Sequence, residues 1–177
     1  MGRPRTIDRD KVLEAAEAIV LRDGAAALTF EAVAKASGVT KGGLQYCFGT
    51  KDDLIAAIVE RWMTALDAEL AQSLPSGADT LEQTRHYIAA AGRIDEVAQT
   101  RMVGMLVTLL QSPEHLRRVR DWYAGWIAKF DPACDAERRA RTAFFAAEGA
   151  FFLRSLGLVA MDGAAWDAVF ADILTLR

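Results

Sequence analysis

Residues 29–46 read TFEAVAKASGVTKGGLQY and contain two short helical patterns separated by a glycine. It predicts a short helix that ends near Gly38 and a second short helix that begins at Thr40. Two helices joined by a brief turn that contains glycine form a helix-turn-helix. Gly38 can adopt the left-handed conformation that such a turn requires, and Val33 and Leu44 are expected to pack between the two helices.

The second short helix carries the pair Gly42-Gly43, and each glycine costs up to about 1 kcal/mol of helix stability relative to alanine. An ordinary helical hairpin does not need that pair, whereas close approach of the helix backbone to another surface does. The helix is expected to expose Lys41, Gln45 and Tyr46, which suit phosphates and base edges, and glutamine can pair bidentately with adenine. We therefore interpret this stretch as a DNA-reading helix-turn-helix.

Further helix starts can be read around this stretch, because capping side chains there are flanked by apolar residues. Asp8, Thr29 and Thr40 can each accept a hydrogen bond from an unpaired backbone N–H, while the apolar pair fixes the entry angle of the chain. Proline occurs only between the periodic apolar segments, and no alternating pattern predicts a strand. We expect about nine helices, at 8–23, 29–36, 40–46, 50–73, 79–94, 96–112, 114–130, 135–157 and 163–176.

The run from Thr40 to Leu54, TKGGLQYCFGTKDDL, resembles the recognition-helix signature of tetracycline-repressor-type (TetR) transcription regulators. The preceding residues, with the first helix, are also similar to the family's amino-terminal domain, so the resemblance covers about residues 8–55. Beyond that range it consists of length and an all-helical pattern. Cys47 is a departure, because the family usually has a histidine there that often adds a phosphate contact.

The resemblance implies an all-α fold, with a three-helix helix-turn-helix domain over residues 1–50 and a larger helical ligand-binding and dimerisation domain over 51–177. It also implies that glycines let the recognition helix enter the major groove deeply and that the next helix begins on a phosphate. Arg3 and Arg5 precede the first helix, where they form either a basic arm on DNA or a solvated tail. The predicted DNA-binding residues are Arg3, Arg5, Thr29, Thr40, Lys41, Gly42, Gly43, Gln45, Tyr46 and Lys51.

The carboxyl-terminal part of the chain has no group of residues typical of a catalytic site. His86 and His115 have neither a neighbouring nucleophile motif nor metal-ligand spacing, and there is no glycine-rich phosphate loop. We therefore expect no enzymatic activity, no cofactor and no metal site. Cys47 and Cys134 lie far apart in the sequence and do not indicate a disulfide framework or a spaced-cysteine zinc site.

Large apolar residues recur in the same part of the chain. Core packing accounts for any single one of them, whereas together they suit an adaptable pocket, in which the family resemblance implies a small-molecule ligand. Glu148 lies in the apolar run AAEGAFF, so its carboxylate needs either an arginine, such as Arg101 or Arg141, or a donor or cation on the ligand. The predicted ligand-binding residues are Trp62, Met102, Met105, Leu106, Leu109, Trp122, Trp126, Phe144, Glu148 and Phe151.

In the family, the last two helices usually pair with their symmetry mates, and a dimer places two recognition helices in successive major grooves about 34–36 Å apart. The resemblance thus implies a homodimeric repressor that binds a pseudo-palindromic operator in double-stranded DNA and is released by a small apolar or amphipathic ligand. The alternatives are a TetR-like DNA binder without an inducer and a helical ligand-binding dimer that has lost DNA binding. The predicted interface residues are Phe145, Gly149, Phe152, Leu156, Trp166 and Phe170.

Composition adds limits to this interpretation. The 177 residues are 52% hydrophobic, which excludes wholesale disorder, and their formal net charge is −3. That charge is uneven, because residues 1–51 hold eight basic and six acidic residues, a net +2, while the rest carries −5. The chain opens on charged residues rather than an apolar signal segment, and no apolar run is long enough to cross a bilayer. We therefore expect no membrane association and a cytoplasmic location.

Overall fold

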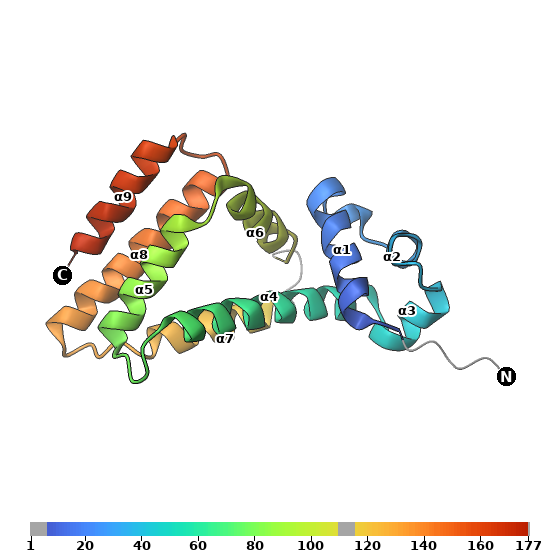
Figure 1. The fold of residues 1–177 in the computed structure, drawn as a ribbon, viewed down its shortest axis with the longest axis horizontal. Helices are drawn as coiled ribbons and strands as arrows, with labels where there is room; N and C mark the ends of the chain where they lie inside the picture. Colours follow the sequence, from blue (N-terminus) through green and yellow to red (C-terminus); the bar gives the residue numbers. More distant parts are fainter. Residues whose placement is uncertain (1–6, 110–115, 177) are drawn as a thin grey trace. The chain divides into compact units, whose positions relative to one another are not determined.

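The computed structural model describes residues 7–109 and 116–176, and over these ranges the chain is all-α, as the sequence predicts. None of the helices in the described ranges is both long enough and apolar enough to cross a membrane. Every predicted helix is present, and the ends that fall on described residues differ by at most three residues, while the predicted end at 112 and start at 114 lie outside the described residues. A short 3₁₀ helix at Ala25–Ala27 was not predicted. The α-helices in Figure 1 are α1 (Arg9–Asp23), α2 (Phe30–Ser37), α3 (Lys41–Phe48), α4 (Lys51–Ser73), α5 (Thr80–Arg93), α6 (Glu96–Leu109), α7 (Leu116–Ile127), α8 (Asp135–Ser155) and α9 (Gly163–Thr175).

The helix starts are fixed by capping side chains. The side chains of Asp8, Thr29 and Thr40 accept hydrogen bonds from backbone N–H groups three residues on, at 3.3, 3.1 and 3.1 Å, which confirms the three predicted caps. Asp79 and Asp162 cap α5 and α9 in the same way, each at 2.8 Å. Each cap satisfies one of the N–H groups that a helix start leaves without a partner.

The described residues form two compact units. One comprises those of Met1–Thr64 and Gly104–Val119, called here the amino-terminal unit. The other comprises those of Ala65–Val103 and Arg120–Arg177, called here the carboxyl-terminal unit. The helices α4, α6 and α7 therefore each contribute residues to both units.

The amino-terminal unit has its own apolar core. α1 buries one face, including Val12 and Ala16, which are 0% exposed. Leu44 from α3 and Leu54 and Ile58 from α4 are also 0% exposed and belong to the same cluster. Burying large apolar side chains stabilises each by about 1.5–3 kcal/mol, so these few residues hold short helices that are marginal alone.

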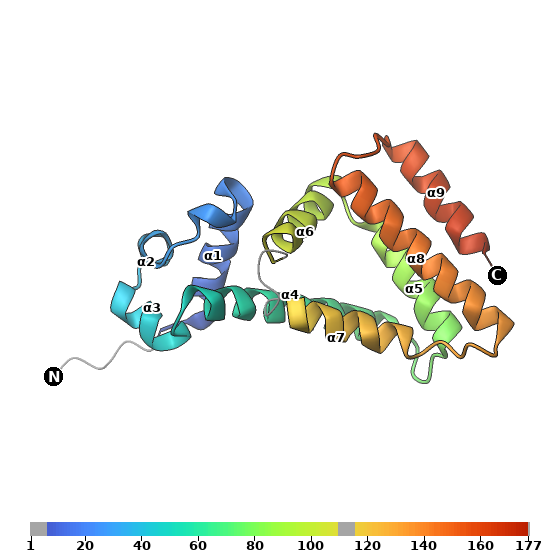
Figure 2. The same cartoon turned by 180° about the vertical axis from the view of Figure 1, so that it is seen from behind.

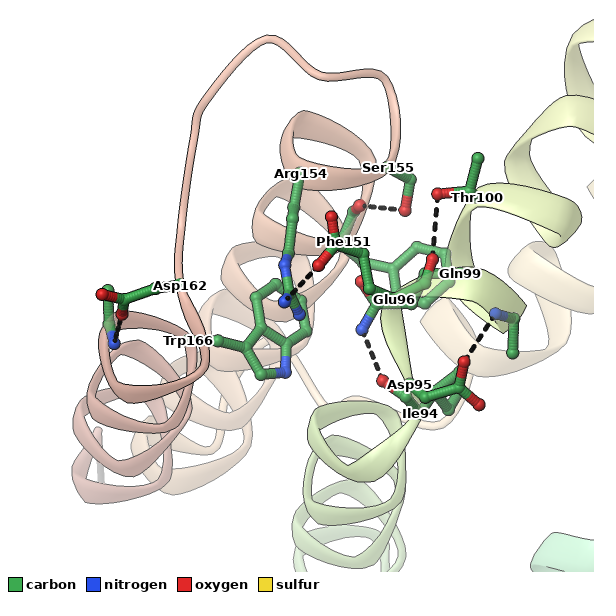
Figure 3. Close-up of polar contacts among 12 residues, drawn as sticks. Ile94, Asp95, Glu96, Gln99, Thr100, Phe151, Arg154, Ser155, Asp162 and Trp166 are labelled. Carbon is green, nitrogen blue, oxygen red and sulfur yellow. Dashed lines mark hydrogen bonds and ion pairs between the residues drawn. The ribbon is translucent and has the colours of Figure 1, made fainter.

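In the carboxyl-terminal unit, α5, α8 and α9 lie side by side (Figure 2). Trp166 of α9 donates from its indole Nε1 to the carbonyl oxygen of Gly92 at 2.7 Å. The guanidinium of Arg154 lies 4.6 Å from the centre of the Trp166 ring and pairs with Glu96 at 3.1 Å (Figure 3). Phe170 packs on Gly92 so closely that a Cβ built there would lie 2.7 Å from the Phe170 ring. Contact between α5 and α9 therefore depends on the absence of a side chain at Gly92.

The close packing at Gly92 leads to a stability prediction. Replacing Gly92 with alanine is expected to lower the free energy of unfolding by about 1–3 kcal/mol, because the new methyl overlaps the core ring of Phe170. Gly125 is a matched control, since it lies within α7 and a Cβ there meets no described atom within 4 Å. Gly125→Ala should be neutral or add up to about 1 kcal/mol. Urea denaturation of both variants checks this, and equal stabilities would contradict it.

Candidate nucleic-acid interface and buried carboxylate cluster

The turn between α2 and α3 has the geometry that the sequence predicts. Gly38 has φ 70° and ψ 18°, which is the left-handed region that glycine occupies without steric cost. Val33 from α2 and Leu44 from α3 are both 0% exposed beneath this turn. The two short helices are therefore packed through a common core, with α3 following the turn after α2 as in a helix-turn-helix.

The outer face of α3 carries polar and aromatic side chains. Leu44 and Phe48 point into the core, whereas Lys41, Gln45 and Tyr46 are exposed. Tyr46 is 91% exposed, an unusual state for a large aromatic residue that suits a contact with a partner molecule. Exposed groups also occur at the start of α2 (Thr29), before α3 (Thr40) and at the start of α4 (Lys51). Arg3 and Arg5, two further predicted DNA-binding residues, lie outside the described residues.

The two glycines of α3 differ in what surrounds them. A Cβ built on Gly43 would lie 2.8 Å from Ile7 Cδ1 and 3.2 Å from Val39 Cγ1. A Cβ on Gly42 would meet no described atom within 4 Å. Packing within the chain therefore explains the lack of a side chain at Gly43. At Gly42 no contact with the described residues requires glycine, whereas close approach of another molecule to the exposed face would require it.

Lys41, a predicted phosphate contact, is ion-paired within the chain. Its ammonium donates to the Glu31 carboxylate on α2, and both side chains are more than half exposed. This hydrogen bond holds the pKa of the Glu31 carboxyl below its usual value. Exposed pairs of this kind contribute little stability, so a phosphate group can compete with Glu31 for Lys41. The sequence did not predict this pair, because it joins different helices.

Arg9 positions α3 and was not among the predicted residues. Its Nη1 donates to the carbonyl oxygen of Cys47 at 2.8 Å, and its guanidinium lies 4.4 Å from the centre of the Phe48 ring. The arginine thus satisfies a carbonyl in the last turn of α3, where positive charge also complements the helix dipole. No local pattern reveals the contact, since Arg9 and Cys47 are 38 residues apart.

A second arginine joins α1 to α4. Arg61 donates to the Asp10 carbonyl oxygen at 3.1 Å and to Glu14 at 3.4 Å, and it lies 3.8 Å from Glu17. Burial raises the pKa of the Glu17 carboxyl, and the nearby charge of Arg61 opposes that rise. Because the Arg61 side chain is only 32% exposed, these contacts restrain α4 against α1 more strongly than a fully exposed pair would.

The carboxyl-terminal unit holds a carboxylate among aromatic rings, here called the Glu148 cluster. Glu148 of α8 accepts hydrogen bonds from the hydroxyls of Tyr87 on α5 and Tyr123 on α7, one on each carboxylate oxygen. The rings beside them belong to residues whose exposure is at most 8%. The cluster consists of Glu148, Tyr87, Tyr123, Trp122, Trp126 and Phe144.

The aromatic rings of the cluster are in mutual contact. The ring centroids of Trp126 and Phe144 are 5.4 Å apart in a stacked arrangement, and Tyr87 lies 5.0 Å from Trp126. The indole Nε1 of Trp122 donates to Asp67 at 2.7 Å. Such aromatic pairs add about 0.5–1.5 kcal/mol each beyond the area they bury, so these ring contacts stabilise the carboxyl-terminal unit.

Glu148 and its partners have shifted pKa values. Burial raises the pKa of the Glu148 carboxyl, and the hydrogen bonds from Tyr123 and Tyr87 only partly oppose this. Burial, together with the negative charge of Glu148, raises the pKa of both tyrosines, so their hydroxyls stay protonated at neutral pH. Arg141 was a predicted partner of Glu148, but no cationic side chain in the described part of the chain forms an ion pair with it. The side chain of Arg101 lies outside the description.

Only part of the predicted ligand-binding set is brought together. The Glu148 cluster contains four of the predicted residues, Trp122, Trp126, Phe144 and Glu148. Its two tyrosines, Tyr87 and Tyr123, were not in the predicted ligand-binding set. Trp62 and Leu106 instead pack on the core of the amino-terminal unit. Phe151 is 9% exposed within α8, and Met102 is partly buried in α6. The side chains of Met105 and Leu109 lie outside the described ones.

The predicted dimer residues differ in exposure. Trp166 and Phe170 are 3% and 5% exposed, because they pack on α5 within the same chain (Figure 3 shows Trp166 beneath Arg154). Phe145 and Leu156 of α8 are 54% and 46% exposed. A partner chain could therefore contact Phe145 and Leu156 of α8, whereas Trp166 and Phe170 expose little surface for such a contact.

No group of histidine, cysteine or acidic side chains among the described residues is arranged to hold a metal ion.

Two family models and a curated protein are similar to this chain. The model for "Bacterial regulatory proteins, tetR family" matches residues 12–58, and the model for "Tetracyclin repressor-like, C-terminal domain" matches residues 82–177. The HTH-type transcriptional regulator BetI of Rhizobium meliloti (strain 1021) is 24% identical over 160 residues, which span 85% of this chain and 79% of that protein.

Solved structures share the fold. The multidrug binding protein EbrR complexed with ethidium superposes with a TM-score of 0.67 and 22% identity, over 93% of this chain and 96% of that chain. A protein from Saccharomonospora viridis in complex with choline superposes with a TM-score of 0.69 and 15% identity, over 93% of this chain and 92% of that chain. At these identities the likeness concerns the arrangement of helices.

The raised pKa of Glu148 predicts a pH effect on stability. A carboxyl that binds its proton more tightly in the folded state stabilises the fold below its ordinary value of 4.5, and this contribution is lost as the pH rises through the folded-state pKa. Glu148→Gln cannot titrate. The melting temperature of the wild type should therefore fall relative to that of Glu148→Gln between about pH 4 and pH 8, because the tyrosines do not ionise there. Melting curves across this range check it, and a constant or opposite difference would contradict it.

Proposed function

This chain belongs to the TetR family of bacterial transcription regulators, and we propose that it is a homodimeric repressor that leaves its operator when a small molecule binds its carboxyl-terminal unit. Family membership means that the chain is a DNA-binding regulator of transcription and not an enzyme. The observation that carries the proposal is the exposed polar face of α3, on a helix whose opposite face is buried in a core.

In the proposed complex, α3 lies in the major groove of the operator. Gln45 and Tyr46 point away from the core and reach base edges, while Lys41 exchanges Glu31 for a phosphate. Gly42 allows the closest approach of the backbone, and Gly43 serves mainly the packing on Ile7. Thr29, Thr40 and Lys51 contact phosphates at the starts of α2, α3 and α4, joined by Arg3 and Arg5 from the terminal segment. We assign DNA binding to residues 1–50, with Lys51 as a further contact at the boundary, and the remaining functions to 51–177.

We assign the dimer contact mainly to the outer face of α8. Phe145, Gly149, Phe152 and Leu156 form one stripe at helical spacing, and two of them are among the most exposed large apolar residues described. A Cβ on Gly149 meets no described atom within 4 Å, so the space there is available to another chain. Two-fold symmetry would then present two α3 helices to a pseudo-palindromic operator.

Release by a small molecule is supported by the composition of the Glu148 cluster and by the ligands of similar proteins. Structural neighbours hold ethidium and choline. The cluster combines aromatic rings with Glu148, an acidic residue that is only partly buried, as expected of a small-molecule site. To change operator occupancy from 99:1 to 1:99, the ligand must favour the DNA-incompatible form by about 5.5 kcal/mol.

Gly42 provides the most direct test of the DNA-binding proposal. Gly42→Ala should preserve or raise the melting temperature, because alanine favours helix and the site is open. It should nevertheless weaken binding to DNA, selected from a random pool by the wild type, by about tenfold or more, since the methyl holds α3 away from the groove. Gly125→Ala, which makes the same change on α7, should bind that DNA like the wild type. Unchanged affinity of Gly42→Ala would contradict the proposed docking.

The α8 interface predicts the effect of a charge on oligomeric state. Phe145→Asp should convert the dimer to a monomer in sedimentation, because it places a carboxylate in an apolar contact. Val97→Asp is the control, since Val97 of α6 is 61% exposed and lies outside the proposed stripe. A wild type that sediments as a monomer, or a Phe145→Asp variant that stays dimeric, would contradict this interface.

A further inference from the structure

Among the described side chains, Glu148 has hydrogen-bond donors but no cationic partner. Each of its carboxylate oxygens already accepts a hydrogen bond from a tyrosine hydroxyl. Among the residues with described side chains, no lysine, arginine or histidine forms an ion pair with it. Hydrogen bonds from neutral hydroxyls compensate the loss of water around a carboxylate less fully than a cation does.

The rings around Glu148 suit a cation. Aromatic faces carry negative potential and attract ammonium groups that lie within about 6 Å of the ring centre. The cluster already shows this property, because Lys129 Nζ lies 4.0 Å from the centre of the Trp126 ring. That ammonium donates to Gln83 at 2.8 Å and not to Glu148, so it leaves the carboxylate without a counter-ion.

The residues of the cluster also differ in burial. Glu148 and Tyr123 are only partly buried, whereas Phe144 is 0% exposed and Trp126 is 6% exposed. A ligand that approaches from the side of these two residues would meet the negative charge and the Tyr123 ring together. Its apolar substituents would then lie against aromatic surface that is already desolvated.

We propose that the Glu148 cluster binds an organic cation, in which a quaternary or protonated tertiary ammonium group pairs with the Glu148 carboxylate and lies against the surrounding rings. This inference rests on the proposed function, because it names the chemical class of the effector. The two tyrosine hydroxyls orient the carboxylate, and the rings select for cations that carry methyl or aryl groups over small hydrated ions.

The wild-type chain allows the first test without any substitution. Tetramethylammonium, choline and benzyltrimethylammonium are titrated into the full chain by calorimetry, and choline is compared with 3,3-dimethylbutan-1-ol, its neutral isostere. The cations should bind, and choline should bind about tenfold or more tightly than the neutral alcohol, because only the cation supplies the missing charge. Failure of all three cations to bind, or equal binding of the alcohol, would overturn the proposal.

Variants then assign binding to the cluster. Glu148→Gln should weaken the best cation by about tenfold or more while leaving affinity for the neutral alcohol unchanged. The control is Glu82→Gln, which removes an exposed carboxylate from α5, the helix that carries Tyr87, and it should bind cations like the wild type. Retained cation affinity in a folded Glu148→Gln variant would show that the carboxylate is only a structural hydrogen-bond acceptor, and would overturn the proposal.

Failure of this inference is distinguishable from failure of the proposed function, because binding of cations is measured without DNA. If neutral lipophilic compounds release the selected DNA and cations do not bind, the repressor proposal stands and the cation site is refuted. If cations bind through Glu148 but never change the affinity for DNA, the site stands and the release mechanism is refuted.

Discussion

The shortness of α3 constrains the whole amino-terminal unit. Eight residues with two glycines cannot form a stable helix alone, so α3 must be held from its inner side. Leu44 and Phe48 bury one face in the core, and Arg9 binds the last turn through a carbonyl oxygen and a ring. Because these contacts hold the buried face of α3, its exposed face is not needed for packing. Tyr46 can therefore be 91% exposed while the fold of the unit is retained.

Each unit holds a partly buried glutamate, and the two carboxylates have different partners. Glu17 lies beside Arg61, so its charge has a partner inside the amino-terminal unit, and this pairing also joins α1 to α4. Glu148 receives only hydroxyl donors. Burial raises the pKa of both carboxyls, and only at Glu17 does the charge of a nearby arginine oppose the rise. A carboxylate beside an arginine joins two helices, whereas one with only hydroxyl donors in an aromatic cluster favours a ligand of opposite sign.

The sequence predicts best what depends on neighbouring residues. The caps at Asp8, Thr29 and Thr40 and the left-handed turn at Gly38 follow from local patterns, and the structure contains each of them. The contacts of Arg9 with α3, Lys41 with Glu31, and Glu148 with two tyrosines join distant segments, so no spacing rule reveals them. Burial of Trp166 and Phe170 against α5 was missed for the same reason, since a large apolar residue near the chain end suits either an interface or an internal contact.

If two copies of α3 bind one operator, hydroxyl-radical footprinting shows this directly on DNA that the full chain selects from a random pool. We expect two protected half-sites related by a dyad, with centres about one helical turn apart, or about 34–36 Å. A single protected half-site, or failure of the selection to enrich any sequence, would contradict it.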